Sequence, residues 1–390
     1  MAEQTMQTSA SPTTRWGRWL IGGVLYLALL ATGLRIGGEL SVFVSASLNV
    51  LPFVGLAILA YFAGTRFNWA WVMSGIWLVL LIGVITMYAA GITMAVLLNF
   101  TPDNLNPPDP SDPAFLTRLQ AANIPGLMLS FIGVIGISSL PLIPAIRRII
   151  ARFIPIDPSS WLHTVALIAV ISVTLIMFIP LFIVGEPPLL MFIRQTNGEV
   201  PSELSDEVQL RAQIYSLIWN IPAALLAVGF GVRRNLVETL TRLGLMRPTL
   251  SQLAMSAGAG LVMAVIVYVG MPFQLSLWQM LGWPTTDHES FAKLLAFALS
   301  PIGAVVVGVT AGLGEELAIR GVLQPRMGLW LSNLFFTSLH AFQYHWDALL
   351  IVFTVGLVCG IIRNRFNTTT AAIVHGVYNC ALILMSITFA

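Results

Sequence analysis

The chain has 390 residues, of which 57% are hydrophobic and only 9% are charged, and its mean hydropathy is +0.86. Soluble domains carry about 25% charged residues, so this composition excludes an ordinary soluble protein. The apolar runs are continuous rather than alternating, which excludes a closed β-barrel and indicates an all-α, polytopic helical membrane protein. The formal net charge of +2 is spread over loops, and no nucleic-acid partner is expected.

The first 15 residues are polar and rich in Ser, Thr and Gln, and we expect a disordered cytoplasmic tail there. The apolar run from Trp19 to Leu34 lacks a small-residue cleavage site soon after it, so we interpret it as a retained first span. Windows of about 20 apolar residues predict about eleven transmembrane helices, near 19–37, 42–64, 70–98, 124–146, 162–184, 214–232, 252–272, 294–316, 329–345, 348–362 and 368–389.

The distribution of basic residues orients these helices. With the N-terminus inside, fourteen of the nineteen Lys and Arg residues fall in inner segments and five in outer ones. Cytoplasmic loops are enriched in Lys and Arg, so this split predicts an inside N-terminus and an outside C-terminus. We expect an integral, multi-pass protein of the plasma (inner) membrane, in contact with the lipid bilayer.

The connecting segments suggest how the chain is divided. Two long acidic segments, 101–120 and 186–207, are expected to form a solvated outer face. Residues 233–245 carry Leu and Val at helical spacing beside basic residues, which is typical of a short helix at the cytoplasmic interface. After the break at Arg247 and Pro248 the chain begins a C-terminal membrane region, 248–390, preceded by an N-terminal membrane region of about six helices, 16–247.

Polar residues are grouped in three places within the most apolar third of the chain. The groups are Glu315 and Glu316 with Arg320, Phe336 with His340, and His375 with Asn379. Helical residues four apart share a face, so each group presents side chains to one side. A charge at the centre of a membrane helix costs about 2.5–3.5 kcal/mol on insertion scales, so these groups should face a protein interior or a wet cavity. Three helices could therefore converge on one pocket.

Adjacent carboxylates cannot point to one place in a helix, because successive residues are about 100° apart. One of Glu315 and Glu316 should enter the pocket as a candidate general base, while the other pairs with Arg320. Asn379 could donate its amide to a developing oxyanion. Each group also has a structural interpretation: solvated carboxylates at the membrane edge, His340 as a hydrogen-bonded core residue, and Asn379 in an interhelical hydrogen bond. The two cysteines, Cys359 and Cys380, are interpreted as small buried hydrophobes.

The order E-E-x-x-x-R, F-x-x-x-H and H-x-x-x-N resembles the CPBP family of intramembrane proteases, which includes type II CAAX prenyl endopeptidases and bacteriocin self-immunity proteins. The motifs stand here as 315–320, 336–340 and 375–379, and the similarity covers roughly 290–390. Residues 238–248 also resemble the segment that leads into this domain in many members. The resemblance implies hydrolysis of a peptide bond in a membrane-associated protein or peptide.

The resemblance also implies roles for the residues of the three motifs. Glu315 with His340 would activate a water, and His375 with Asn379 would stabilise the oxyanion. Glu316 and Arg320 would hold and tune the catalytic set, and Phe336 would pack against the pocket wall. The family often carries the label metalloprotease, and Glu315, His340 and His375 could supply three zinc ligands, but we favour a metal-free site.

Two other functions remain open from the sequence. The first is a non-catalytic membrane immunity or scaffold protein of the same fold. The second is a proton-coupled transporter, since buried Glu and His also serve as proton relays. No repeat of discontinuous helices in two halves supports the transporter.

Overall fold

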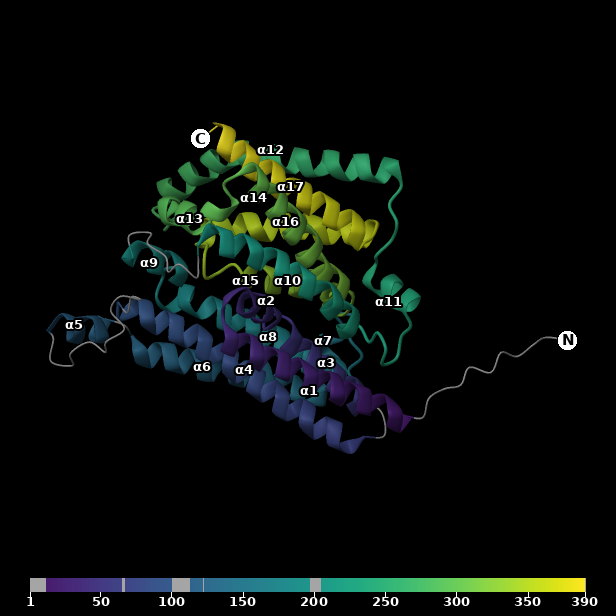
Figure 1. The fold of residues 1–390 in the computed structure, drawn as a ribbon. Helices are drawn as coiled ribbons and strands as arrows, with labels where there is room; N and C mark the ends of the chain where they lie inside the picture. Colours follow the sequence, from purple (N-terminus) through teal and green to yellow (C-terminus); the bar gives the residue numbers. More distant parts are fainter. Residues whose placement is uncertain (1–11, 65–66, 100–112, 122, 197–204, 390) are drawn as a thin grey trace.

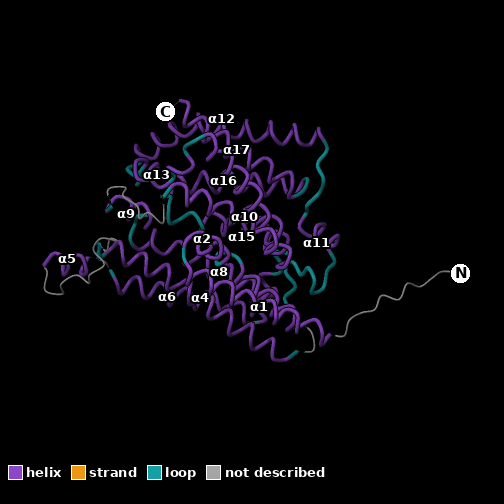
Figure 2. The backbone as a smooth tube through the Cα atoms, viewed as in Figure 1, coloured by secondary structure: helices purple, strands orange, loops and turns teal. Residues whose placement is uncertain are grey.

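A computed structural model describes residues 12–64, 67–99, 113–121, 123–196 and 205–389. Over these residues the chain forms helices and no β-strand, joined by loops (Figure 2). The all-α membrane fold expected from the composition is therefore confirmed. Of the expected disordered tail, 1–15, residues 1–11 lie outside the described residues. The rest of that segment belongs to a helix, which begins at Pro12.

The N-terminal region packs one group of helices, coloured purple to blue and teal in Figure 1. Prolines stand in the first turn of α3, α6, α7 and α9, where the missing backbone N–H costs no hydrogen bond. The helices are α1 (Pro12–Ile36), α2 (Gly38–Ser47), α3 (Leu51–Ala63), α4 (Asn68–Leu97), α5 (Pro113–Ala121), α6 (Ile124–Ser139), α7 (Pro144–Ile150), α8 (Trp161–Ile183), α9 (Pro188–Gln195) and α10 (Asp206–Ala227).

The C-terminal region forms a second group, coloured green to yellow in Figure 1, and α10 lies between the two groups. A short 3₁₀ turn, η4, precedes α14, and two wide π-helical segments, η5 and η6, follow it. The elements are α11 (Leu236–Leu243), α12 (Leu250–Met280), α13 (His288–Leu294), η4 (Ala296–Ala298), α14 (Pro301–Val309), η5 (Thr310–Glu315), η6 (Leu317–Leu323), α15 (Gln324–Ser338), α16 (Trp346–Arg365) and α17 (Thr368–Phe389).

The structure reduces the expected number of membrane spans. Among the described residues, eight helices are long and apolar enough to cross a bilayer, or nine if α2 and α3, bent by 42°, form one broken span. The windows at 294–316 and 329–345 fall within one helical run, Pro301–Ser338, and α10 does not qualify. The figure of eleven is therefore not confirmed, because a hydropathy window cannot tell that two apolar stretches follow each other in one helical run.

The predicted interfacial helix is present as α11. Asn235 and Glu238 cap its start reciprocally, each side chain accepting a bond from the other residue's backbone N–H, which satisfies two otherwise unpaired donors. Gly244 ends the helix with a φ of 71°, a conformation that favours glycine. There the Thr368 hydroxyl donates to the Leu243 carbonyl at 2.6 Å, and the Thr368 N–H to that of Gly244 at 3.1 Å. The end of α11 is thus fastened to the start of α17.

The segments expected to form a solvated outer face contain two helices. Part of each segment, residues 101–112 and 197–204, lies outside the described residues. Where the structure describes them, α5 and α9 lie at the same end of the molecule as α13, opposite α11 (Figure 1). The segments predicted to lie outside the membrane and the short helix predicted to lie on its inner side are therefore at opposite ends of the fold (Figure 1).

Candidate active site

The segment that carries Glu315, Glu316 and Arg320 is a π-helix rather than the α-helix that the spacing predicted. Its backbone bonds join residues five apart, and such wide turns are frequent at functional sites. Close packing against α17 accompanies this geometry. A Cβ added at Gly312 would lie 2.6 Å from the Ala372 carbonyl oxygen, so only glycine lets the two backbones come this close.

Glu316 is the centre of a buried charged group. Its side chain and that of Arg320 are 0% and 1% exposed, and their Oε2 and Nε atoms are 3.3 Å apart. The other carboxylate oxygen, Oε1, accepts a hydrogen bond of 2.9 Å from Nδ1 of His375 on α17. Glu316 is thus the carboxylate that pairs with Arg320, and Glu315 is the one left partly exposed, which is the division expected from the sequence.

Arg320 connects three helices around this centre. Its Nη2 donates to the Gly356 carbonyl on α16 at 2.5 Å, and its guanidinium carbon lies 4.7 Å from the ring centroid of Phe336 on α15. Asn333 also links α15 to α16 near this centre, because its amide donates to the Phe353 carbonyl at 2.9 Å. A buried charge is tolerated only when it is paired and hydrogen-bonded, and these contacts supply such partners for Arg320.

Glu315 lies at the edge of the buried group, with 38% of its side chain exposed. Its Oε2 is 4.0 Å from Nε2 of His375, a distance beyond direct hydrogen bonding. Because Nδ1 of His375 faces the Glu316 carboxylate, that nitrogen carries the proton, and a neutral ring presents the lone pair of Nε2. The Glu315 carboxylate and this nitrogen therefore face each other at the accessible side of the site.

His340 lies nearby but in a different setting from the one expected. Helix α15 ends at Ser338, so His340 stands in the turn that follows and not inside the helix. Its Nδ1 donates to the Phe336 carbonyl at 3.0 Å, which leaves the lone pair of Nε2 free. The Phe336 ring lies 4.9 Å from that of His340 and 6.1 Å from that of His375. Phe336 thus contacts both imidazoles.

Glu315 and His340, which the family resemblance pairs around a water, are not joined directly in the part of the chain that the structure describes. Among the described residues, no hydrogen bond or ion pair joins His340 to Glu315 or His375. Any joint action of His340 and Glu315 therefore has to pass through a molecule bound between them. Asn379, one turn beyond His375 on α17, is half-buried and has no hydrogen-bond partner in the described part of the chain.

Two residues near the site were not singled out from the sequence. Tyr344 stacks on His340 with ring centroids 5.9 Å apart, and burial together with the Glu315 carboxylate raises the pKa of its phenol, so it stays protonated at neutral pH. Tyr344 follows His340 by four residues, as His340 follows Phe336. This repeated spacing is the feature of the sequence that could have identified it. Cys359 on α16 is fully buried, as expected of a small hydrophobe, but it lies beside Glu316 and His375.

The arrangement does not fit a zinc ion well. Of the expected ligands, Glu315 and His375 approach each other, but His340 belongs to no compact group of donors among the described residues. The compact set of three donors among the described residues is instead Glu316, Cys359 and His375, within 4.8 Å of one another. In that set Glu316 and His375 already bond to each other, and Arg320 places a fixed positive charge beside the carboxylate. A second cation there would be repelled.

The remaining histidine of interest, His345, has a structural role. Its Nε2 donates to the Gly185 carbonyl at 2.8 Å, and its Nδ1 accepts from the Trp346 N–H at 2.8 Å. Both ring nitrogens are therefore used in fixing the start of α16.

Taken together, fold and site define a polytopic helical membrane protein with a buried carboxylate–imidazole–guanidinium centre at its C-terminal end. Residues 296–381 match the family model described as "Type II CAAX prenyl endopeptidase Rce1-like", and this stretch contains all three motifs. This match supports the resemblance of the C-terminal region to the CPBP family, which includes the type II CAAX prenyl endopeptidases, and that resemblance is therefore confirmed. No curated protein and no solved structure gives a significant match.

Proposed function

We propose that the protein is an active intramembrane endopeptidase that hydrolyses a peptide bond in a membrane-associated protein or peptide. The observation that carries the proposal is the division of the two carboxylates. Glu316 is fully buried and occupied by Arg320 and His375, whereas Glu315 stands beside them with an exposed edge. Glu316 holds the neighbouring side chains in place, and Glu315 is free to contact a water and a substrate.

In the proposed reaction, Glu315 accepts a proton from a water that the Nε2 lone pair of His340 helps to orient. The water oxygen attacks the scissile carbonyl carbon, and the carbonyl oxygen becomes an oxyanion. When the C–N bond breaks, the proton held by Glu315 passes to the leaving amine, and the second proton of the water stays on the new carboxyl group, so the products are a carboxylic acid and an amine. General acid–base catalysis of this kind contributes about 10²–10⁴-fold.

His375 and Asn379 are the proposed oxyanion donors. The Glu316 carboxylate on Nδ1 of His375 stabilises a protonated ring, as an acid behind a catalytic histidine does. Nε2–H can then donate to the oxyanion, and the unpartnered amide of Asn379 adds a second donor from the same face of α17. Tyr344 stacks on His340 and we propose that it positions this ring.

We propose that the reaction uses no metal. The donors nearest to one another are engaged in the Glu316–His375 bond and lie beside Arg320. Metal binding would have to break both interactions. Zinc titration by calorimetry on the purified protein tests this: tight, stoichiometric binding that is lost in His375→Ala would contradict the metal-free proposal.

The proposed substrate class is a membrane-anchored peptide, and the proposed location is the plasma membrane. The name of the matching family points to a prenylated C-terminal peptide as the first substrate to test. A peptide library with and without a prenyl group, presented in liposomes, would show whether the anchor is required.

The decisive experiment compares Glu315→Gln with Glu289→Gln in liposomes that contain a membrane-anchored reporter peptide. Glu289 lies exposed on α13 in an ion pair with Lys293, far from the motifs in sequence, so its variant controls for the loss of one charge. We expect cleavage by Glu315→Gln to fall about 10²–10⁴-fold, with an unchanged melting temperature. Full cleavage by Glu315→Gln would refute the proposed base, and a cell phenotype that survives in this variant would favour the non-catalytic immunity or scaffold protein.

A further inference from the structure

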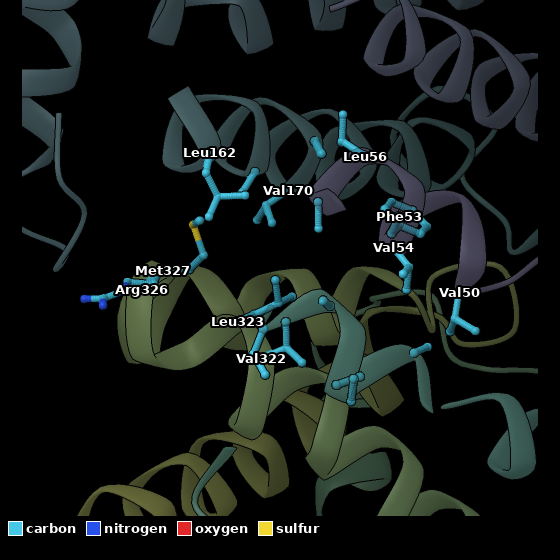
Figure 3. Close-up of a pocket in the computed structure, with 18 of the residues that line it drawn as sticks. Val50, Phe53, Val54, Leu56, Leu162, Val170, Val322, Leu323, Arg326 and Met327 are labelled. Carbon is cyan, nitrogen blue, oxygen red and sulfur yellow. The ribbon is translucent and has the colours of Figure 1, made fainter. Parts of the chain in front are cut away.

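A cavity of about 320 Å³ lies between the N-terminal and the C-terminal helices, and none of the proposed catalytic side chains lines it. Figure 3 shows its walls. Leu56 of α3 and Val170 of α8 face Val322 and Leu323 on the opposite side, with Val50 at one end. Most of the lining side chains are apolar.

The size and lining of this cavity point to an apolar ligand. Protein interiors contain few voids larger than a water molecule, and a volume of this size falls in the range of small-molecule sites. An apolar wall offers water no hydrogen bonds, and even apolar cavities of about 150 Å³ stay dry and take up apolar molecules. A hydrocarbon chain is the occupant that such a wall would accept.

Four arginines line the same cavity, and these we call the arginine cluster: Arg233, Arg234, Arg242 and Arg326. Figure 3 shows Arg326 at one end of the cavity, beside Met327 and Leu162. No ion pair joins any of the four to a carboxylate within the described ranges. Their positive charge is therefore not neutralised by the protein.

Two members of the arginine cluster donate hydrogen bonds to backbone carbonyls, and the other two are available to bind a ligand. Arg242 donates to the carbonyls of Gly321 and Val322, and Arg234 to that of Val228. Arg233 lies 4.6 Å above the Tyr61 ring, and Arg326 has no hydrogen bond or ion pair in the described part of the chain. Burial, followed by the charges of Arg326 and Arg234, lowers the pKa of Arg242 to about 10, so it remains charged at neutral pH.

The cluster lies where an anionic headgroup would be found. All four arginines fall in segments that the charge distribution assigns to the inner side of the membrane. Basic pockets between membrane helices on that side bind phosphate-bearing lipid headgroups. Apolar walls and an uncompensated cationic end are together complementary to one molecule, a lipid with a hydrocarbon chain and an anionic head.

We propose that the cavity binds an anionic phospholipid, with an acyl chain between α8 and η6 and its phosphate on the arginine cluster. This site is separate from the proposed protease centre and does not depend on it. The two share one element, however, because η6 turns Ala318, Ile319 and Val322 to the cavity and Arg320 to Glu316. A bound chain would therefore support the outer face of the helix that holds the charged centre.

Native mass spectrometry of the full chain in detergent tests the proposal. The probes are dioleoyl phosphatidylglycerol, dioleoyl phosphatidylcholine and inorganic phosphate. The double variant Arg233→Gln/Arg326→Gln removes the two arginines that bond no backbone, and Ala57→Phe fills the apolar part of the cavity. Arg148→Gln, on α7 at the same side of the membrane and outside the cavity lining, is the matched charge control.

We expect phosphatidylglycerol to bind the native chain more tightly than phosphatidylcholine. The double variant should bind it about 25-fold more weakly, from about fivefold per basic residue near an anionic lipid. Ala57→Phe should bind both lipids more weakly, and Arg148→Gln should match the native chain. Equal binding of the two lipids, an unchanged affinity in the double variant, or displacement of phosphatidylglycerol by equimolar inorganic phosphate would overturn the proposal.

Discussion

The two membrane regions differ in how they use polar side chains. In the N-terminal region the buried hydroxyls of Thr93, Ser138 and Thr174 each donate to the carbonyl four residues earlier in their own helix. Such bonds satisfy the hydroxyl without linking two helices. No charged side chain is buried among the described residues of this region, and apolar clusters fill its interior, such as the one between α4, α6 and α8 around Phe131 and Ile176.

In the C-terminal region buried polar side chains connect different helices. Arg320 donates to Gly356, Gln324 to Gly360 and Asn333 to Phe353, and each acceptor is a carbonyl on α16. Polar and charged groups in a membrane interior are costly and mark functional sites. The difference indicates that apolar contacts hold the first region together. The second region holds a charged centre, which these hydrogen bonds to α16 keep in place, and we call this set of bonds the polar frame.

The strongest test of this difference is Glu316→Ala. Removing one partner of a buried ion pair leaves the other charge uncompensated, and the cost is about 3–5 kcal/mol. We expect the free energy of unfolding in detergent to fall by that amount and cleavage to be lost with it. If the variant melts like the native chain, Arg320 must have another source of compensation, and the charged centre is not what holds the region together.

Asn379→Ala separates catalysis from packing. Because Asn379 has no hydrogen-bond partner among the described residues, its loss should leave the melting temperature unchanged. If it is an oxyanion donor, kcat for a reporter peptide should fall about 10²–10³-fold. Ser386→Ala, which removes a bond within the same helix α17, is the control and should retain activity. A loss of stability without a loss of kcat would instead assign Asn379 to interhelical packing.

Glycine substitutions compare the tightness of the two regions. A Cβ at Gly356 would lie 2.2 Å from Asn333 Oδ1 and 2.9 Å from the Phe336 ring. Gly356→Ala should therefore destabilise the protein by about 1–3 kcal/mol, as overpacked cores do. A Cβ at Gly91 on α4 meets nothing within 4 Å, so Gly91→Ala should be neutral or slightly stabilising. Equal melting temperatures for the two variants would show that the polar frame is not tightly packed.

The smallest expected effect is in the N-terminal region. Ser74 on α4 accepts a hydrogen bond of 2.7 Å from the Trp161 indole on α8, which is an uncharged polar link between two helices of this region. Interhelical hydrogen bonds in membranes average about 0.6 kcal/mol, so Ser74→Ala should lower stability by about that much and leave cleavage unchanged. Ser130→Ala, which loses a bond within α6, should be silent. A larger loss than in Gly356→Ala would reverse the contrast between the regions.

The sequence predicted the class of the fold and much of the chemistry of the candidate site. Composition alone indicated helices in a membrane, and the four-residue spacing placed Arg320 against Glu316 and left Glu315 apart. These features follow from local geometry, which a sequence contains. The start of α11 likewise depends on residues close in sequence, the capping pair Asn235 and Glu238, and the helix lies within the segment where it was expected.

Other features depend on contacts between helices and could not be predicted. The bond between His375 and Glu316 joins segments 59 residues apart, and no local pattern tells which ring meets which acid. The end of α15 before His340 and the wide turns of η5 and η6 arise from packing against neighbours. The bend at Gly328, where φ is 71°, within the helical run Pro301–Ser338 is likewise not visible to a hydropathy window.

The attachment of α11 to α17 has a mechanical consequence. Helix α11 is short and amphipathic, and its far end is fastened through Gly244 to Thr368, seven residues before His375. A hydrogen-bonded helix transmits axial movement along its length with little loss. A displacement of α11 would thus act directly on the first turn of α17, the helix that bears His375.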